Sequence, residues 1–152
     1  MAAANSRGRT ALVRCRFRSG GVLVEILFLI GRIIVGLFYL VSAANHFRNL
    51  DMMAQYAGAK GVPASRAAII VTSLMLLIGG LTILTGFLPV VGIALLVVFL
   101  FGTAFIIHNF WAIEDEQQRQ MEVVQFMKDL ALAGSLLMFL AIDRPWPLSL
   151  NF

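Results

Sequence analysis

Charged residues are scarce in this sequence. Asp, Glu, Lys and Arg together supply 13% of its 152 residues, whereas 60% are hydrophobic. A water-soluble domain usually carries about 25% charged residues, because polar groups must cover its surface. The composition and a mean hydropathy of +0.89 therefore exclude an ordinary soluble domain and indicate a chain that lies in a lipid bilayer.

Cysteine is nearly absent as well, and Cys15 is the one instance. A single thiol excludes an internal disulfide framework and a C-x-x-C redox motif. The sequence also lacks a Walker loop, a Rossmann fingerprint, a nucleophile-base-acid set and a nucleic-acid-binding module. It therefore contains no self-contained catalytic motif, its catalytic residues stay unknown, and electron chemistry would need a bound cofactor or a partner.

Long apolar runs make up most of the chain. A bilayer span needs about 20 mainly apolar residues as a helix. Four segments qualify: residues 22–44, 67–86, 89–111 and 123–142. They do not show the short alternating segments of a membrane β-barrel. We therefore predict an all-α integral membrane four-helix bundle, up-down-up-down, formed by residues 22–152 after a basic cytoplasmic tail of residues 1–21.

The connections between the spans carry weaker signals. Residues 51–56 are expected to form a short interfacial helix in the first loop, and Ser65 is expected to cap the second span. Pro89 suits the first turn of the third span, where its missing N–H costs nothing. We interpret five glycines as small surfaces for close helix packing: Gly79, Gly80, Gly86, Gly92 and Gly102.

Positive charge is concentrated before the first span, in Arg7, Arg9, Arg14, Arg16 and Arg18. Such clusters mark the cytoplasmic side of a membrane protein, so both termini are predicted to be cytoplasmic. The loops at 45–66 and 112–122 are then outside. The first apolar run is too long for a signal peptide, and we expect it to be retained. The net charge of +4 therefore reflects orientation, and no nucleic-acid partner is predicted.

Ionisable residues inside the predicted spans need a physical reason, because each costs about 2.5 to 3.5 kcal/mol at a helix centre. Arg32 lies near the midplane of the first span, where it either contacts an anion or lipid headgroup inside the bundle, forms an internal salt bridge, or extends to the interface as a snorkelling arginine. Lys128 and Asp129 lie one to two turns into the fourth span. Adjacent helical residues point about 100° apart, so only one of these two can face the bundle.

Two histidines lie at the outer ends of the first and third spans. Asn45 precedes His46 and Asn109 follows His108, and the topology brings both pairs to the same membrane face. Imidazoles there could relay protons or bind a carbonyl group, or they could be ordinary members of the interfacial belt that includes Trp111. Their spacing does not predict a metal site. The candidate polar cavity comprises Arg32, Asn45, His46, His108, Asn109 and Lys128.

Four motifs occur in sequence order: GRIIVGLFYLVSAANHF in the first span, LLIGGLTILTGF in the second, HNFW ending the third and QFMKDLALAGSLLMF in the fourth. With this order and spacing the chain resembles the DoxX family of four-span bacterial membrane proteins over nearly all of its length beyond Gly21. The resemblance implies a multi-pass protein of the bacterial inner (plasma) membrane. It places the six cavity residues and Trp111 on recurring polar positions of the family. Asp129 departs from the asparagine that many members have after the lysine.

The resemblance leaves several functions open. DoxX members are linked to thiosulfate:quinone oxidoreductase subunits, to membrane oxidoreductase complexes in oxidative-stress defence and, in distant relatives, to assembly of membrane proteins. The leading hypothesis is a membrane subunit or anchor of a redox system, with a soluble or membrane oxidoreductase as partner. The cofactor is unknown, with quinone as the candidate. The alternatives are a non-catalytic assembly partner and, less supported, a small-solute transporter. A homo-oligomer is left open.

Overall fold

The computed structural model describes residues 21–150, and within that range every regular element is a helix. The four long helices are α2 (Gly21–Arg48), α4 (Ser65–Thr85), α5 (Pro89–Gly102) and α6 (Glu116–Met138). All four, counting the turns that extend α5 and α6, are long and apolar enough to cross a membrane. The predicted all-α membrane bundle is therefore confirmed. The predicted basic tail, apart from Gly21, lies outside the described residues.

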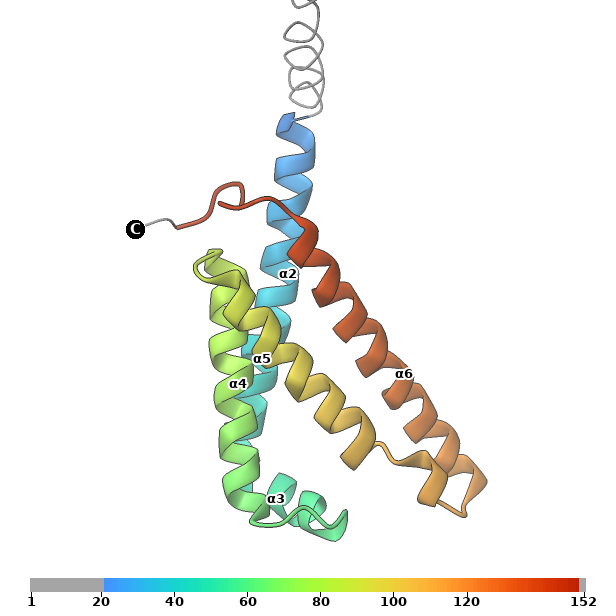
Figure 1. Cartoon of the computed structure of the whole chain (residues 1–152). Coiled ribbons are helices and arrows are strands. Elements are labelled where there is room, and N and C mark those ends of the chain that lie inside the picture. Colours follow the sequence, from blue (N-terminus) through green and yellow to red (C-terminus); the bar gives the residue numbers. More distant parts are fainter. Residues whose placement is uncertain (1–20, 151–152) are drawn as a thin grey trace, which may run out of the picture.

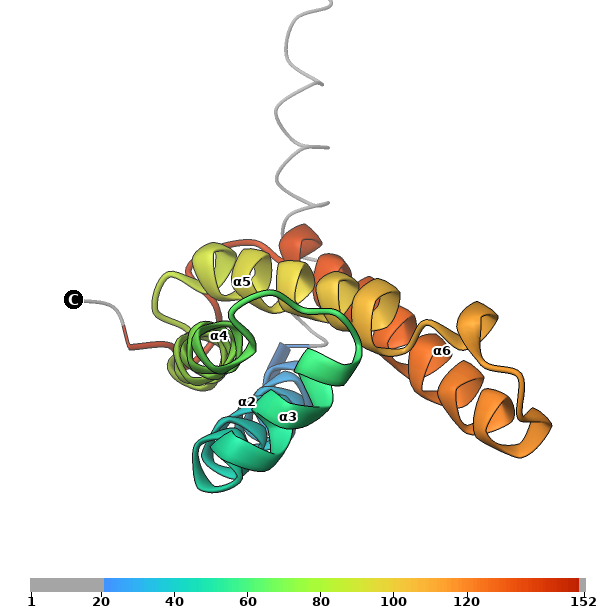
Figure 2. The same cartoon turned by 90° about the horizontal axis from the view of Figure 1, so that it is seen from below.

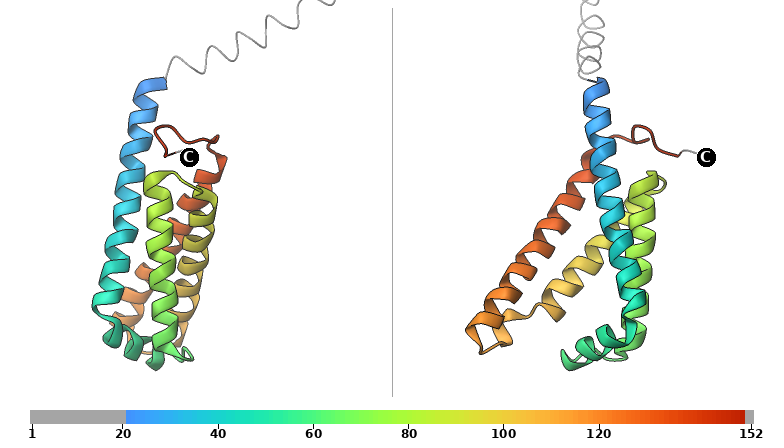
Figure 3. Two further views of the ribbon diagram at one scale, coloured as in Figure 1. Left: turned by 90° about the vertical axis from the view of Figure 1, so that its left-hand side faces the viewer. Right: turned by 180° about the vertical axis from the view of Figure 1, so that it is seen from behind.

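The helices run up-down-up-down, as predicted (Figure 1). Helices α2 and α4 form an antiparallel pair, α5 packs on α4, and α6 packs on α5 (Figure 2). Figure 3 shows that α5 and α6 diverge from the α2/α4 pair toward the end that holds the short helix α3 (Leu50–Ala59). We call this the α3 end. The opposite end holds the turn between α4 and α5, and we call it the hairpin end.

Glycines allow the close approach of neighbouring helices. A Cβ atom at Gly36 would lie 2.8 Å from Leu84 Cβ, and one at Gly80 would lie 3.1 Å from the carbonyl oxygen of Gly36, so α2 and α4 touch along their backbones. Between α4 and α5, a Cβ at Gly92 would collide with Thr82. Gly102 is different, because a Cβ there would meet nothing within 4 Å. Packing of this kind holds helices together in lipid, where no hydrophobic effect drives their association.

The apolar side chains divide between a small core and the outer surface. Tyr39, Leu76, Ile83 and Leu96 are buried in the core between the helices. Many large apolar side chains point outward instead, among them Val41, Leu74, Val98 and Met138. Apolar outer faces on helices of this length suit the hydrocarbon region of a bilayer, so the chain is a multi-pass membrane protein.

Three local predictions need correction. The interfacial helix is longer than residues 51–56, since α3 covers Leu50–Ala59. Ser65 does not cap α4: the cap position is Ala64, in a left-handed conformation and with no side-chain hydrogen bond. The fourth helix begins at Glu116, earlier than position 123, because the Asp115 side chain accepts a hydrogen bond from the Gln118 N–H and caps a polar first turn. This early start places Glu122 inside the helix.

Candidate functional site

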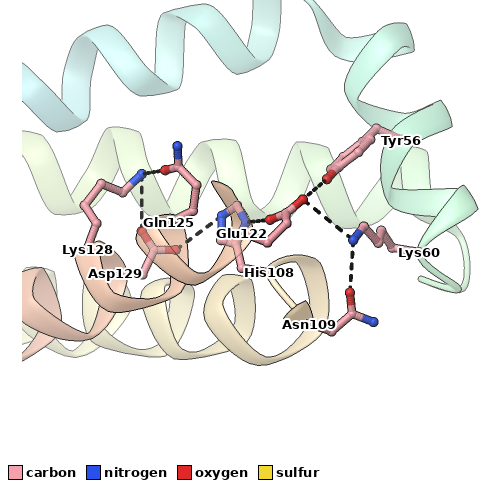
Figure 4. A network of polar contacts seen from close by, with 8 residues as sticks. All are labelled: Tyr56, Lys60, His108, Asn109, Glu122, Gln125, Lys128 and Asp129. Atoms are coloured by element: carbon pink, nitrogen blue, oxygen red, sulfur yellow. Dashed lines mark hydrogen bonds and ion pairs between the residues drawn. The ribbon is translucent and has the colours of Figure 1, made fainter. Parts of the chain in front are cut away.

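The third span ends in an unusual turn that positions His108. Beyond α5 the chain continues through a π-helical turn, η1 (Thr103–Ile107), and a short 3₁₀ turn, η2 (Phe110–Ala112). The N–H of His108 donates to the carbonyl oxygen of Thr103 at 3.1 Å, one residue further back than in an α-helix. Helix α5 packs against α6, and the wider turn directs the largely buried His108 side chain to that helix, as Figure 4 shows.

Helix α6 presents two carboxylates to this histidine. Glu122 and Asp129 are both buried, and because they lie seven residues apart they occupy the same side of the helix. The Lys128 side chain is half exposed, and its Nζ lies 3.6 Å from Asp129 Oδ1. Of the adjacent pair, Asp129 is therefore buried in the bundle, whereas Lys128 lies at its edge.

The imidazole of His108 lies between the two carboxylates. Its Nδ1 is 2.6 Å from Glu122 Oε2, a short hydrogen bond, and its Nε2 is 3.7 Å from Asp129 Oδ2. Each ring nitrogen thus faces a different acid. A histidine in this position can accept a proton on one side and release one on the other.

Helix α3 closes the site from the α3 end. The Tyr56 hydroxyl donates to Glu122 Oε1 at 3.0 Å, and Lys60 Nζ lies 3.8 Å from the same oxygen. Lys60 also donates to Asn109 Oδ1 at 3.0 Å. Burial raises the pKa of Tyr56 above its ordinary value, and the hydrogen bond to the Glu122 carboxylate and its negative charge raise this pKa further. We call the connected set in Figure 4 the His108 network: Tyr56, Lys60, His108, Asn109, Glu122, Gln125, Lys128 and Asp129.

Two cavities adjoin the network. The larger, about 470 Å³, lies between α3, α4 and α5, and its lining is mostly apolar, with His46, Tyr56 and His108 as the ionisable residues. We call it the apolar slot. The smaller, about 200 Å³, lies between α2, α5 and α6, and we call it the polar cavity. Its polar lining consists of Tyr39, Ser42, His46, Thr103, His108, Lys128 and Asp129. His46 and His108 line both spaces.

The structure brings together four of the six residues of the candidate polar cavity. His46, His108 and Lys128 line the polar cavity, and Asn109 joins the His108 network through Lys60. Asn45 does not, because its side chain is exposed and its Oδ1 accepts a hydrogen bond from Asn49. Whether these residues bind a ligand stays a prediction.

Arg32 lies far from the others, about 21 Å along α2 from His46 at the helical rise of 1.5 Å per residue. Its buried guanidinium donates to three backbone carbonyls at the hairpin end: Ile83 at 3.2 Å, Leu84 at 2.9 Å and Pro147 at 2.7 Å. The first two belong to the last turn of α4, where carbonyl groups lack helical partners. The structure thus assigns Arg32 to fastening the C-terminal segment onto α4.

Several polar residues of the site are missing from the candidate polar cavity. Glu122 falls in a segment expected to be a loop, and Tyr56 and Lys60 belong to α3. A usable signal exists in helical spacing: Glu122 and Asp129 on α6, and Tyr39, Ser42 and His46 on α2, recur at intervals of three, four or seven residues. Such spacing puts polar groups on one face of a membrane helix, which marks that face as inward.

Comparison with known proteins agrees with the described fold. The DoxX family model matches residues 27–109, which run from the first span through His108 and Asn109. The chain is 28% identical to the inner membrane protein YphA of Escherichia coli (strain K12) over 136 residues, which cover 90% of this chain and 96% of that protein. No solved structure matches. Since the family model spans more than half of its length, this chain belongs to the DoxX family.

Proposed function

We propose that this protein is an inner-membrane subunit or anchor of a redox system and that its apolar slot binds a quinone. The observation that carries the proposal is the lining of the slot, which is apolar except for a few polar groups. One of these, His108, is hydrogen-bonded on its far side to the Glu122 carboxylate. Small-molecule sites in proteins typically combine an apolar lining with a few polar groups that fix orientation. A quinone, with an apolar ring and tail and two carbonyl oxygens, matches that combination.

The ionisable residues of the slot suit the reduction of a quinone. Reduction to the quinol takes up two electrons and two protons. Imidazole and phenol groups can donate hydrogen bonds to the quinone oxygens, and His108, supplied from Glu122, can deliver a proton. The electrons would come from an oxidoreductase partner, which agrees with the absence of a self-contained catalytic motif in the sequence.

The size of the slot also fits this ligand. Its volume of about 470 Å³ lies in the range of roughly 300 to 1,000 Å³ that is usual for small-molecule sites. Gly102 borders the slot and has no neighbour within 4 Å of its Cβ position, so the space beside it is open to a ligand. Outward-facing apolar side chains nearby, such as Val98 and Ile106, would admit a lipid-soluble molecule from the bilayer.

The proposal includes an orientation. The arginine cluster before α2 favours cytoplasmic termini, and the α3 end, with the His108 network, would then face the outer side of the membrane. The name of the relative from Escherichia coli favours an inner-membrane location for this chain as well.

The test uses a substitution that fills the slot. Gly102→Leu places a side chain in the open space, whereas the matched control Gly134→Leu places the same side chain on an exposed face of α6 that also has no neighbour within 4 Å. Protein in native-lipid particles should contain quinone at a ratio above that of the surrounding lipid. Gly102→Leu should lose that excess and Gly134→Leu should keep it. Equal quinone content in all three would refute the proposal and favour the assembly role.

A further inference from the structure

Three buried polar atoms gather around the polar cavity without a hydrogen-bond partner among residues 21–150. They are Tyr39 Oη, His46 Nδ1 and Asp129 Oδ2, and all three side chains line that space. Tyr39 is 1% exposed and Asp129 is 4% exposed. Buried polar groups in native proteins are almost always paired with protein or ordered water, because an unpaired one costs about 1 to 3 kcal/mol. Their convergence indicates that the cavity takes hydrogen-bonding molecules.

Water fits this space in size and chemistry. A water molecule occupies about 30 Å³ in the liquid and needs two to four polar partners to be held inside a protein. The cavity offers about 200 Å³ and further polar groups on Ser42, His108 and Lys128. A dry, purely apolar cavity would not present these groups. Several waters can therefore bridge the three atoms.

His108 connects this cavity with the α3 end. Its Nε2 faces Asp129 Oδ2 across 3.7 Å, which is too long for a direct hydrogen bond, and both residues line the polar cavity, where water can connect them. Its Nδ1 is already hydrogen-bonded to Glu122, which in turn contacts Tyr56 and Lys60 of α3. The imidazole is thus the link between an inner and an outer carboxylate.

We propose that Glu122, His108 and Asp129 form a proton path that joins the α3 end to a hydrated cavity inside the bundle. A proton on the Glu122 carboxyl passes to His108 Nδ1 and gives an imidazolium. The Nε2 proton then passes, through water, to Asp129. The ring is restored by the reverse transfers or by rotation of the imidazole. No bond other than N–H and O–H changes, and no electron is transferred.

The surrounding charges keep such a path open. Lys60 offsets the charge of Glu122, and Lys128 offsets that of Asp129, so one additional proton leaves a net charge of +1 on whichever pair holds it. The two ends of the path therefore carry the same charge before and after the transfer, only exchanged between them. The titratable groups that face the path are Tyr56 and Lys60 from α3, Tyr39 and His46 from α2, and Lys128 from α6.

The role of the proton path rests on the proposed function, because it would supply protons to a bound quinone. The path itself does not require a quinone. Because His108 lines both the apolar slot and the polar cavity, a quinone beside it would exchange protons with the α3 end of the bundle. Protein from which quinone has been extracted should still contain the path, so the two proposals can fail separately.

The experiment follows carboxyl groups by infrared spectroscopy in quinone-extracted protein in lipid nanodiscs. Difference spectra between acidic and neutral buffers should show a carboxyl signal that disappears in Asp129→Asn and survives in the control Asp51→Asn, which alters an exposed ion pair with Arg66. On mixing with D₂O, the Asp129 signal should shift as its proton exchanges. In His108→Phe this exchange should slow by at least about tenfold, because the acid-base group between the carboxylates is lost.

A second variant tests whether slower exchange in His108→Phe results from misfolding. His108→Gln keeps hydrogen-bonding groups and similar length but cannot pass a proton through a ring, so it should slow the exchange as His108→Phe does. Unchanged exchange in either variant while the protein remains helical by circular dichroism would overturn the path. So would an Asp129 signal that does not exchange in the wild-type protein, since that would mean a dry cavity.

Discussion

His108 Nδ1 and Glu122 Oε2 lie 2.6 Å apart, although His108 follows the third span, Glu122 lies in α6 and fourteen positions separate them in the chain. The contact joins the end of the third span to the second turn of α6. It also draws in α3 through Tyr56, so three elements meet at one carboxylate. A bond of this length between a buried carboxylate and an imidazole is strong when the imidazole is protonated.

This contact should contribute measurably to stability. We expect Glu122→Gln to lower the free energy of unfolding by about 1 to 3 kcal/mol, because it removes the charged partner of a buried bond. His108→Gln should do the same, and the double variant should cost less than the sum of the two. Unfolding in mixed micelles measures all three. Glu114→Gln, at an exposed loop position, is the control, and fully additive losses would contradict the coupling.

Tyr56 should make the protein sensitive to alkaline pH. Its pKa in the folded state is raised above its ordinary value of about 10. The folded state therefore prefers the neutral phenol, and the stability this provides is present below pH 10 and is lost as pH rises through the folded pKa. Tyr39 and Tyr56 are the two tyrosines of the sequence, so phenolate absorbance in Tyr39→Phe reports Tyr56 alone.

The melting temperature of Tyr39→Phe should accordingly fall as pH rises above 10. Further replacement of Tyr56 by Phe should flatten this dependence, since the group responsible is gone. A phenolate midpoint at or below 10 in the folded protein would be the opposite of the expected result.

Arg32 should act on folding and not on ligand binding. Arg32→Gln removes the charge and at least one of the three bonds to backbone carbonyls, since an amide has only two N–H donors, and we expect a loss of about 3 kcal/mol. Quinone content per folded protein should be unchanged. The control is Arg66→Gln, whose exposed ion pair with Asp51 is worth at most about 1 kcal/mol. Selective loss of quinone in Arg32→Gln would instead return this residue to the ligand site.

Gly92 should tolerate no larger residue. Gly92→Ala would force its Cβ against Thr82, and overpacking of this kind costs about 1 to 3 kcal/mol. Thr82→Ala should recover part of the loss in the double variant. At Gly134, where nothing lies within 4 Å, the same Gly→Ala change should be neutral or stabilising. Thermal melts in detergent distinguish these outcomes, and a harmless Gly92→Ala would mean that α4 and α5 pack less closely than described.

The fold could be predicted from the sequence because the number and length of the membrane spans can be read from the apolar runs. Each apolar run is long enough to cross the bilayer, and short turns leave little choice of neighbour, as at Pro89. The α3 helix was predicted too, although too short. The start of α6 was misplaced because its first two turns are polar, and a polar helix outside the membrane looks like a loop when only hydropathy is considered.

The site could be predicted only in part. His46 and His108 were predicted to share a membrane face, and they do line the same cavities. Glu122 was not predicted to belong to the site, because its burial depends on α3 folding over it, and that is a contact between segments distant in the sequence. Arg32 was grouped with the histidines because the sequence shows no partner for it. Its acceptors are backbone carbonyls, which every residue has and no sequence pattern reveals.

The π-helical turn at Thr103–Ile107 has a consequence for how this site can change over evolution. In an α-helix each residue turns the chain by about 100° about the helix axis. The extra residue of the π turn therefore determines the direction in which the side chains after it point. Loss of one residue there would leave every side chain of the His108 network in the protein yet aim the imidazole at a different neighbour. The chemistry of this bundle is therefore encoded in a count of residues as much as in their identities.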